Sequence, residues 1–136
     1  MRGILTTAAA AAIGLTMLVV PTAAAQDLGA QAVGCNPDQH VRIHVQKRGN
    51  FIDGLGGFFQ CDSPNTVGFR ITVQRKRFIG WYDEVPRTGS WPRNQYTTTV
   101  FTCTGQGEKT YRTQMTGTLG SGKTWVRNSS QITVTC

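Results

Sequence analysis

The sequence has few acidic residues and no long stretch with the period of an α-helix. Seven Asp and Glu residues stand against fourteen Lys and Arg residues in a chain of 136. Apolar residues spaced three and four positions apart, as in an amphipathic helix, do not recur over any useful length. After the first 25 residues Leu and Ala are scarce, whereas Thr, Gly and Val are common. This composition favours β-strands over helices.

Several motifs of enzymes and metal sites are also missing. No G-x-S-x-G nucleophile motif occurs. The cysteines are widely spaced without a C-x-x-C pair, so we expect no metal and no cofactor. Glycoside hydrolysis needs two carboxylates across a cleft, but Asp38 and Asp62 stand in turn contexts, and the adjacent Asp83 and Glu84 point to opposite faces of a strand. We therefore expect a protein that binds and does not catalyse.

One enzymatic alternative stays open. A small basic ribonuclease would use His40 or His44 with Glu84 or Glu108 as acid and base, and arginines to hold phosphate. The two histidines are four residues apart in a strand-like run and would share one face. His44 alternates with apolar residues alongside Arg42, so a solvated surface histidine is the simpler interpretation.

The long apolar run stands at the start of the chain. Residues 1–25 combine Arg2, an apolar stretch from Ala8 to Val20, Pro21 and three small alanines. This arrangement predicts a secretory signal peptide cleaved before Gln26, too short for a comfortable membrane span. Removing 25 of 136 residues leaves 111, enough for one domain. Thirteen cations then face seven acidic residues, a net charge of +6, and we expect a secreted protein with no membrane span.

All four cysteines lie after the predicted leader. An even number in a small exported domain predicts two disulfides. Four cysteines allow three pairings. We favour Cys35–Cys61 and Cys103–Cys136, because sequential pairs suit neighbouring strands. Each bridge should stabilise the fold by about 3 kcal/mol through the unfolded state.

Alternating apolar and polar residues predict a series of short strands. They fall at residues 41–46, 67–74, 96–103, 109–117, 124–127 and 131–136, with a further strand or strand edge at 78–82. Tyr111, Thr113 and Met115 share one face of their strand. Short strands with turn signals about every ten residues favour an all-β, disulfide-stapled antiparallel β-sandwich of the immunoglobulin-like type over residues 35–136. Residues 26–34 form an N-terminal arm before it.

Two segments are expected to be irregular. Three glycines among large apolar residues at 51–59 predict a loop that leads into a short strand. The segment from Asp83 to Asn94 contains Pro86, Gly89 and Pro92, and predicts a long presented loop.

Cations and aromatic residues gather in one part of the sequence. Six of the thirteen cations fall between positions 70 and 93, interleaved with aromatic residues. Such a surface could bind nucleic acid, but in an exported protein we expect other secreted proteins as partners, because Trp, Tyr and Arg dominate protein interfaces. The predicted partner-binding residues are Trp91, Arg87, Arg93, Trp81 and Tyr82, with Leu28 and Val33 in the arm. Trp81 and Trp125 also suit core packing, since both stand in strand-like runs.

These features together resemble a known type of exported protein. They are the alanine-rich leader, the short arm before the first cysteine, two predicted disulfides, a Thr-rich β-domain and the C-terminal Val-Thr-Cys. Small exported proteins of this kind are common in filamentous actinobacteria such as Streptomyces. Among them the chain resembles the adaptor (B) subunit of umbrella toxin particles, which are secreted antibacterial assemblies.

The resemblance implies a specific role. In that family the adaptor links a lectin-like subunit to the repeat-built spoke of a large toxin subunit, partly by lending an N-terminal strand. By this resemblance Gln26–Val33 would be the lent strand, and the loop bearing Trp91 would meet the other partner. An inhibitor of a secreted protease is the alternative, with 83–94 as its presented loop, although no cysteine braces that segment.

Overall fold

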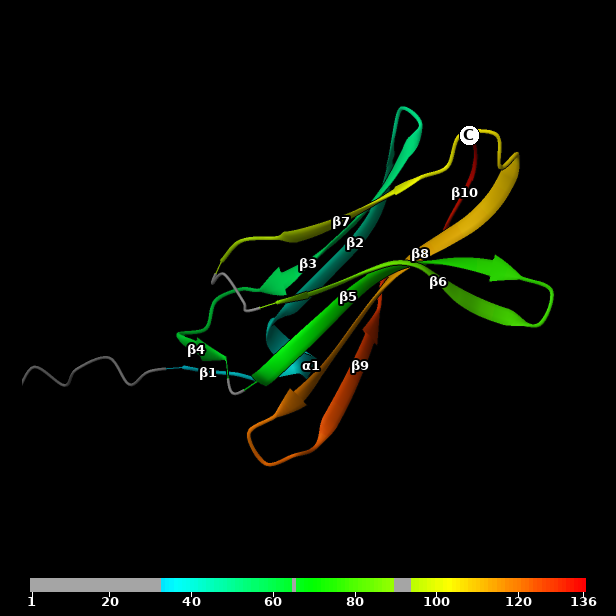
Figure 1. Ribbon diagram of the computed structural model, residues 1–136. Coiled ribbons are helices and arrows are strands. Elements are labelled where there is room, and N and C mark those ends of the chain that lie inside the picture. The colour runs from blue at the N-terminus through cyan, green and yellow to red at the C-terminus, as the bar shows by residue number, and fades with distance from the viewer. Residues whose placement is uncertain (1–32, 65, 90–93) are drawn as a thin grey trace, which may run out of the picture.

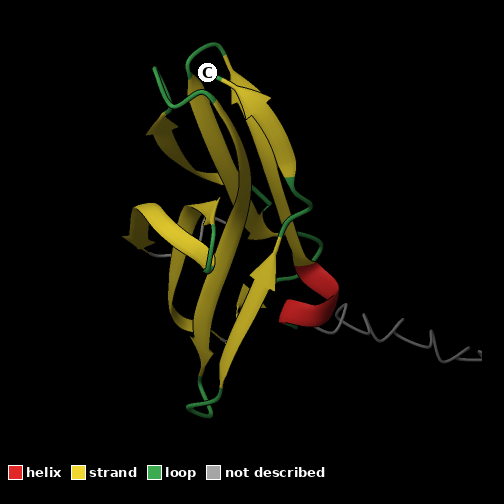
Figure 2. Cartoon of the chain, turned by 90° about the vertical axis from the view of Figure 1, so that its right-hand side faces the viewer, coloured by secondary structure: helices red, strands yellow, loops and turns green. Residues whose placement is uncertain are grey.

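The computed structural model describes residues 33–64, 66–89 and 94–136. Their elements follow the chain in this order: β1 (Gly34–Cys35), α1 (Pro37–His40), β2 (Val41–Arg48), β3 (Phe51–Phe58), β4 (Ser63–Pro64), β5 (Thr66–Arg77), β6 (Gly80–Gly89), β7 (Thr97–Thr102), β8 (Glu108–Leu119), β9 (Thr124–Asn128) and β10 (Ile132–Thr135) (Figure 1). Strands dominate in every view, and the single short helix lies beside the start of the described chain (Figure 2). The prediction of a mostly antiparallel β-protein is confirmed.

The strands form two larger sheets and one small one. One sheet has the order β10-β8-β5-β6, with β9 also paired to β8, and the other has the order β2-β3-β7. All their neighbours run antiparallel. The small sheet is the parallel pair β1 and β4. Strand β6 is therefore an edge strand, paired along one side with β5.

The core has two clusters, and each contains residues from both larger sheets. The first contains Cys35, Phe58, Cys61, Phe69, Ile71, Met115 and Trp125. The second contains Val45, Ile52, Val73, Cys103 and Tyr111. Tyr111, Thr113 and Met115 are fully buried, as the alternation in β8 predicts. Trp125 is also buried, which confirms the expectation of core packing for this residue.

Each core cluster is joined to a disulfide, and both favoured pairings are confirmed. The Cα atoms of Cys35 and Cys61 are 5.0 Å apart, and those of Cys103 and Cys136 are 5.5 Å apart. Among the described residues no cysteine is free. Because the two bridges lie in different clusters, they fasten different ends of the protein.

The loop expected at 51–59 is wrong over its first eight residues, because Phe51–Phe58 form β3. This strand lies between β2 and β7 and pairs with both. A Cβ atom at Gly56 would overlap the thioether of Met115, and one at Gly54 would lie 2.9 Å from the Thr113 hydroxyl. The glycines therefore let the facing sheet approach closely, a use of glycine that looks like a loop signal in the sequence.

The expected loop from Asp83 to Asn94 is wrong over Asp83–Gly89, which belongs to β6. These residues pair with β5 in register from Phe69↔Gly89 to Gln74↔Asp83. Pro86 is accommodated because an edge strand leaves one row of backbone donors unpaired. The register shifts between Val73 and Gln74, where the strands form a bulge or irregularity.

His40 and His44 do not share a strand. His40 ends helix α1, whose first turn is capped by the Asn36 side chain, which accepts a hydrogen bond of 2.9 Å from the Asp38 amide. His44 lies in β2 and packs edge-on against Tyr96, with ring centroids 5.5 Å apart. The helix forms because Asn is a favoured cap and Pro37 suits the first helical position.

Candidate interaction surfaces

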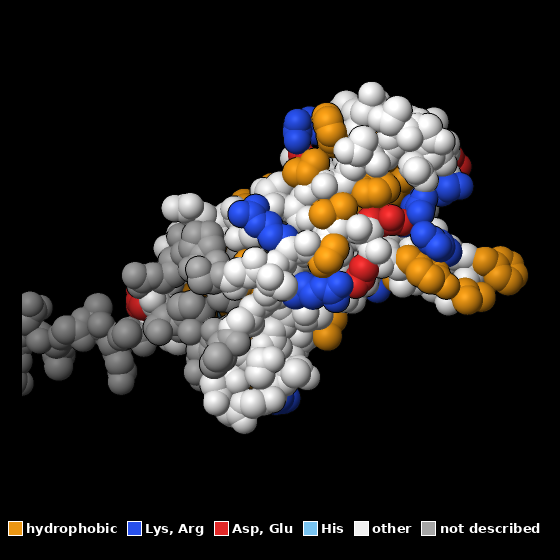
Figure 3. Space-filling model, viewed as in Figure 1, with side chains coloured by type: hydrophobic (Ala, Val, Ile, Leu, Met, Phe, Trp, Pro, Cys, Tyr) orange, Lys and Arg blue, Asp and Glu red, His pale blue; other side chains and the backbone are white. Residues whose placement is uncertain are grey.

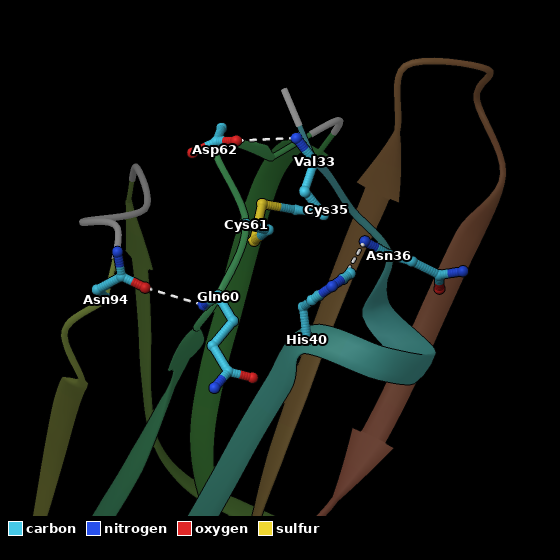
Figure 4. Close-up of a disulfide and its surroundings, with 8 residues drawn as sticks. All are labelled: Val33, Cys35, Asn36, His40, Gln60, Cys61, Asp62 and Asn94. Atoms are coloured by element: carbon cyan, nitrogen blue, oxygen red, sulfur yellow. Dashed lines mark hydrogen bonds between the residues drawn. A yellow bond between two sulfur atoms is a disulfide. The ribbon is translucent and has the colours of Figure 1, made fainter. Parts of the chain in front are cut away.

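The start of the described chain is fastened at one point, which we call the arm root: Val33, the Cys35–Cys61 bridge and Asp62 (Figure 4). The Val33 amide donates to the Asp62 carboxylate over 2.8 Å, and the Asp62 amide donates to the Val33 carbonyl over 2.8 Å. Gly34 then pairs in parallel with Ser63. Four local constraints thus hold the residue at which the N-terminal arm joins the folded domain.

The neighbourhood of the arm root is held by short polar contacts. The Asn36 amide donates to His40 Nδ1 over 2.9 Å, and the Gln60 amide donates to Asn94 Oδ1 over 2.9 Å (Figure 4). The Asn94 amide also donates to the Phe58 carbonyl over 3.0 Å. Asn94 is the first described residue after 90–93, so the chain re-enters the described fold at this end.

An open groove of about 710 Å³ adjoins the arm root. One wall comes from residues 34–38 and the other from β9 and the turn before it. Arg127 and Asp38 form an ion pair that joins the two walls. Its lining includes the apolar residues Leu119 and Trp125 and the polar residues Asn36 and Lys123.

Arg87 also lies toward this end, on the last part of β6. Its guanidinium donates to the Thr98 carbonyl over 2.8 Å, and the Thr99 hydroxyl donates to the Val85 carbonyl over 2.9 Å. These two bonds bridge β6 to β7, the edge strand of the other sheet. Beside them a hollow of about 450 Å³ is lined by residues that include Arg87, Gly89 and Tyr96.

Trp81 and Tyr82 lie at the opposite end of β6, each beneath an arginine. The Arg112 guanidinium lies 4.2 Å from the centroid of the Trp81 ring, and that of Arg77 lies 4.5 Å from the Tyr82 ring. Both aromatic residues are half-buried. Trp81 is thus covered by Arg112 and is not part of either core cluster.

A polar network covers the face of the larger sheet that points away from the core. Gln74 is 5% exposed. Its side chain donates to Asp83 over 2.7 Å and to Gln114 over 3.2 Å, and accepts from Arg112 over 2.8 Å. Asp83 also pairs with Arg70 at 2.7 Å. Burial lowers the pKa of the Arg112 guanidinium, but such a group stays charged at any ordinary pH. The network holds strand register, with Arg70 paired to Asp83 and Arg112 stacked on Trp81.

A charged pair is buried on the other face of β5 and β6. Arg75 Nε lies 2.6 Å from Glu84 Oε1, and the two side chains are 15% and 14% exposed. Arg77 approaches the same carboxylate at 3.8 Å. Desolvation by burial raises the pKa of the neighbouring Tyr111 phenol above its ordinary value. Glu84 is therefore occupied by arginines and does not meet either histidine.

The structure divides the predicted partner-binding residues into two groups. Val33 and Arg87 lie toward the arm-root end, whereas Trp81 and Tyr82 lie near the other end of β6. Six strand positions separate Trp81 from Arg87, which is about 20 Å at the usual rise per residue. The remaining predicted residues, Leu28, Trp91 and Arg93, lie outside the described residues.

The most exposed apolar residues were not among those predicted. Phe78 and Ile79 form the turn between β5 and β6 and are 104% and 80% exposed. Apolar side chains project at the tip of this hairpin, with cationic side chains beside them (Figure 3). The sequence signal was the Arg-Lys-Arg run directly before two large apolar residues. The strand predicted at 78–82 was wrong for Phe78 and Ile79, because it placed both residues in a sheet and not in an exposed turn.

Within the described ranges, no set of three or more His, Cys, Asp or Glu side chains lies close enough to hold a metal ion. Nor does any helix of this part of the chain have the length and apolar character needed to cross a membrane. Comparison with protein-family models, with curated proteins and with solved structures found no match for this chain.

Proposed function

We propose that this chain is a secreted, non-enzymatic adaptor that binds another secreted protein by lending its N-terminal arm as a β-strand. By the resemblance described above, the partner is the large subunit of an antibacterial toxin assembly, and a lectin-like subunit occupies a second surface. The proposal includes export, with residues 1–25 removed, and a disulfide-stapled, immunoglobulin-like sandwich built from the two facing sheets.

The arm root is the observation that carries this proposal. A lent strand must start from a fixed point in an extended direction, because an anchor that moves would add an ordering cost to binding. Val33 meets this need through its two hydrogen bonds with Asp62 and through the disulfide two residues later. Strand β1 follows Val33 directly, so the described chain is extended from its second residue.

The composition of the arm suits strand addition. Added strands bind through backbone donors and acceptors, and alternate side chains fill small pockets. Residues 26–33 contain no proline and combine the small Ala30 and Ala32 with the larger Leu28 and Val33. A partner with an open sheet edge and a narrow apolar groove would accept this pattern.

A second contact is proposed close to the first. Trp91 and Arg93 lie between Gly89 and Asn94, and Asn94 is bonded to Phe58 and Gln60 beside the arm root. Arg87 lies on the same end of β6. Both partners would then meet this end of the protein, which suits an adaptor that joins two subunits.

The experiment is a pull-down of the mature protein from its native culture medium, with identification of the bound proteins by mass spectrometry. Deletion of residues 26–32 should abolish recovery of one partner and leave the melting temperature unchanged, because these residues precede both disulfide loops. Ala30→Pro with Ala32→Pro should have the same effect, because proline removes the backbone donors that strand addition uses.

The matched control is Ala30→Ser with Ala32→Ser, which keeps the donors and should retain the partner. Recovery of every partner by the proline variant would show that the arm does not act as a strand. Trp91→Ala should weaken a different contact, by about 2 kcal/mol if it is an interface anchor. An unchanged affinity together with a lowered melting temperature would place Trp91 in a structural role instead.

A further inference from the structure

The β5–β6 hairpin extends beyond the sheet that supports it. Pairing between β5 and β8 ends at Arg75↔Tyr111, whereas pairing between β5 and β6 continues to Arg77↔Gly80. The last two residues of β5 and the first residues of β6 therefore form a free two-stranded ribbon (Figure 1). We call this ribbon and its turn the hairpin tip.

The turn at the hairpin tip contains residue types that are uncommon in two-residue hairpin turns. Hairpins closed by two residues prefer Asn, Asp and Gly there, but this one has Phe78 and Ile79. Neither residue has a positive φ, and neither is covered by the described chain, with exposures of 104% and 80%. Two large apolar side chains held in water contribute nothing to folding, so they point to a contact outside the chain.

Cations surround the apolar pair. Lys76, Arg77 and Lys109 line a hollow at the base of the hairpin tip together with Arg75 and Phe78. Glu84 offsets part of this charge through Arg75 and Arg77. Lys76 and Lys109 have no ion-pair partner in the part of the chain that the structure describes, and their charges are available to an anionic surface.

We propose that the hairpin tip binds anionic lipid bilayers, with Phe78 and Ile79 entering the interface and Lys76, Arg77 and Lys109 meeting the lipid headgroups. An apolar element beside basic residues is the combination by which proteins bind such interfaces, since apolar burial and attraction to anionic lipids both contribute. The proposal goes beyond the adaptor function and does not depend on it.

The dimensions of the hairpin tip favour a bilayer over a protein partner. The free ribbon from Arg75 to Arg77 advances about 7 Å, and interfacial apolar groups are buried about 5–10 Å below the headgroup boundary. A stable protein interface needs roughly 1,200 Å² or more of buried surface, far more than two side chains on a narrow projection supply. Trp81, which pairs with Lys76, and Tyr82, which pairs with Arg75, lie at the base of the tip. Tryptophan and tyrosine are the residues enriched at membrane interfaces.

The test is co-sedimentation of the mature protein with vesicles of equimolar phosphatidylglycerol and phosphatidylcholine, and with vesicles of phosphatidylcholine alone. The protein should bind the anionic vesicles and lose most of this binding on the neutral ones. Phe78→Ser with Ile79→Ser should reduce binding by at least about tenfold, in line with the apolar area of the two side chains. Its melting temperature should stay unchanged, since neither side chain is buried.

Matched controls distinguish insertion of the hairpin tip from non-specific hydrophobic adsorption and from non-specific electrostatic attraction. Val100→Ser and Val126→Ser, which alter exposed apolar residues elsewhere, should bind vesicles like the unmodified protein. Lys76→Glu should weaken binding about fivefold or more, whereas Lys123→Glu, in the turn between β8 and β9, should have a smaller effect.

Two outcomes would overturn the proposal. If the Phe78 and Ile79 variant binds anionic vesicles as well as the unmodified protein, the attraction is electrostatic and the tip does not insert. If the unmodified protein binds neither kind of vesicle, the tip contacts a protein or another surface. Loss of vesicle binding leaves the pull-down with the arm variants unaffected, so the two proposals fail separately.

Discussion

At the arm-root end the polar groups of the backbone are bonded over short distances, whereas at the hairpin-tip end two large apolar side chains stand in water. Both ends carry one disulfide, and each disulfide belongs to its own core cluster. The first end immobilises the chain at Val33. The second presents Phe78 and Ile79 on a ribbon beyond the sheet. The comparison shows that the backbone at one end is fixed by hydrogen bonds and a disulfide, whereas the other end leaves two apolar side chains uncovered.

Removal of a disulfide should have the largest effect on the free energy of unfolding. It also tests the comparison directly, because each end of the protein has its own bridge. The paired cysteines are 26 and 33 residues apart, so removal of either bridge by a double Cys→Ser change should cost about 3–4 kcal/mol in denaturant unfolding. Only loss of Cys35–Cys61 should increase hydrogen exchange at the Val33 amide under native conditions. Equal exchange in both variants would mean that Asp62 holds the arm root without the bridge.

A second effect concerns the core cluster nearer the arm root. Gly56→Ala should destabilise the protein by about 2 kcal/mol, because the added methyl group meets the Met115 thioether. The matched control is Gly34→Ala, because a Cβ atom at Gly34 has no atom within 4 Å. Gly49→Ala is unsuitable, because Gly49 has a positive φ. Thermal unfolding of Gly56→Ala in the Met115→Ala background should show a smaller loss. A loss of the same size in both backgrounds would exclude this contact as the cause.

Asp62 offers a smaller test of the arm root. Asp62→Ala removes the acceptor for the Val33 amide and should cost about 1 kcal/mol in urea unfolding. Asp62→Asn keeps an acceptor oxygen at that position and should retain most of the stability. If Asn and Ala behave alike, the carboxylate charge and not the hydrogen bond stabilises this end.

Tyr111 gives the smallest effect and tests the cluster nearer the hairpin tip. Its hydroxyl is buried and has no hydrogen-bond partner within the described ranges. Because burial raises its folded-state pKa, the unfolded state loses the proton first as pH rises, so stability should fall above about pH 10. Tyr111→Phe should change stability at pH 7 by less than about 1 kcal/mol and flatten this alkaline decline.

The measurement for Tyr111 is urea unfolding at a series of pH values between neutral and strongly alkaline. The same alkaline decline in both proteins would assign the titration to other groups.

The sequence was sufficient for the features that depend on local pattern. Period-2 alternation predicted β5 and β8, and sequential spacing led to both disulfides. The loop predicted at 51–59 was wrong because the need for Gly56 arises from Met115, far away in the chain. The loop predicted at 83–94 was wrong over its first seven residues because proline is tolerated in an edge strand, and edge position is a property of the whole sheet.

The candidate surfaces were predictable only as a list of residue types. Trp, Tyr and Arg were identified as a group, but the separation of Trp81 from Arg87 along β6 follows from their membership of one continuous strand. The hairpin tip could not be inferred from alternation, because exposure of Phe78 depends on where the support from β8 ends. The approach of Asn94 to Gln60 likewise joins residues 34 positions apart.

The parallel pairing of β1 with β4 has a mechanical consequence. A partner that pulls on the arm applies tension at Gly34, one residue before Cys35. That tension passes into the covalent Cys35–Cys61 bond and from there into β3 and β5, the strands on either side of Cys61 and β4 in the chain. The force is then shared by both sheets before it reaches a long ladder of hydrogen bonds. An arm attached in this way cannot be pulled away by breaking hydrogen bonds one after another, because the Cys35–Cys61 bond carries the load first.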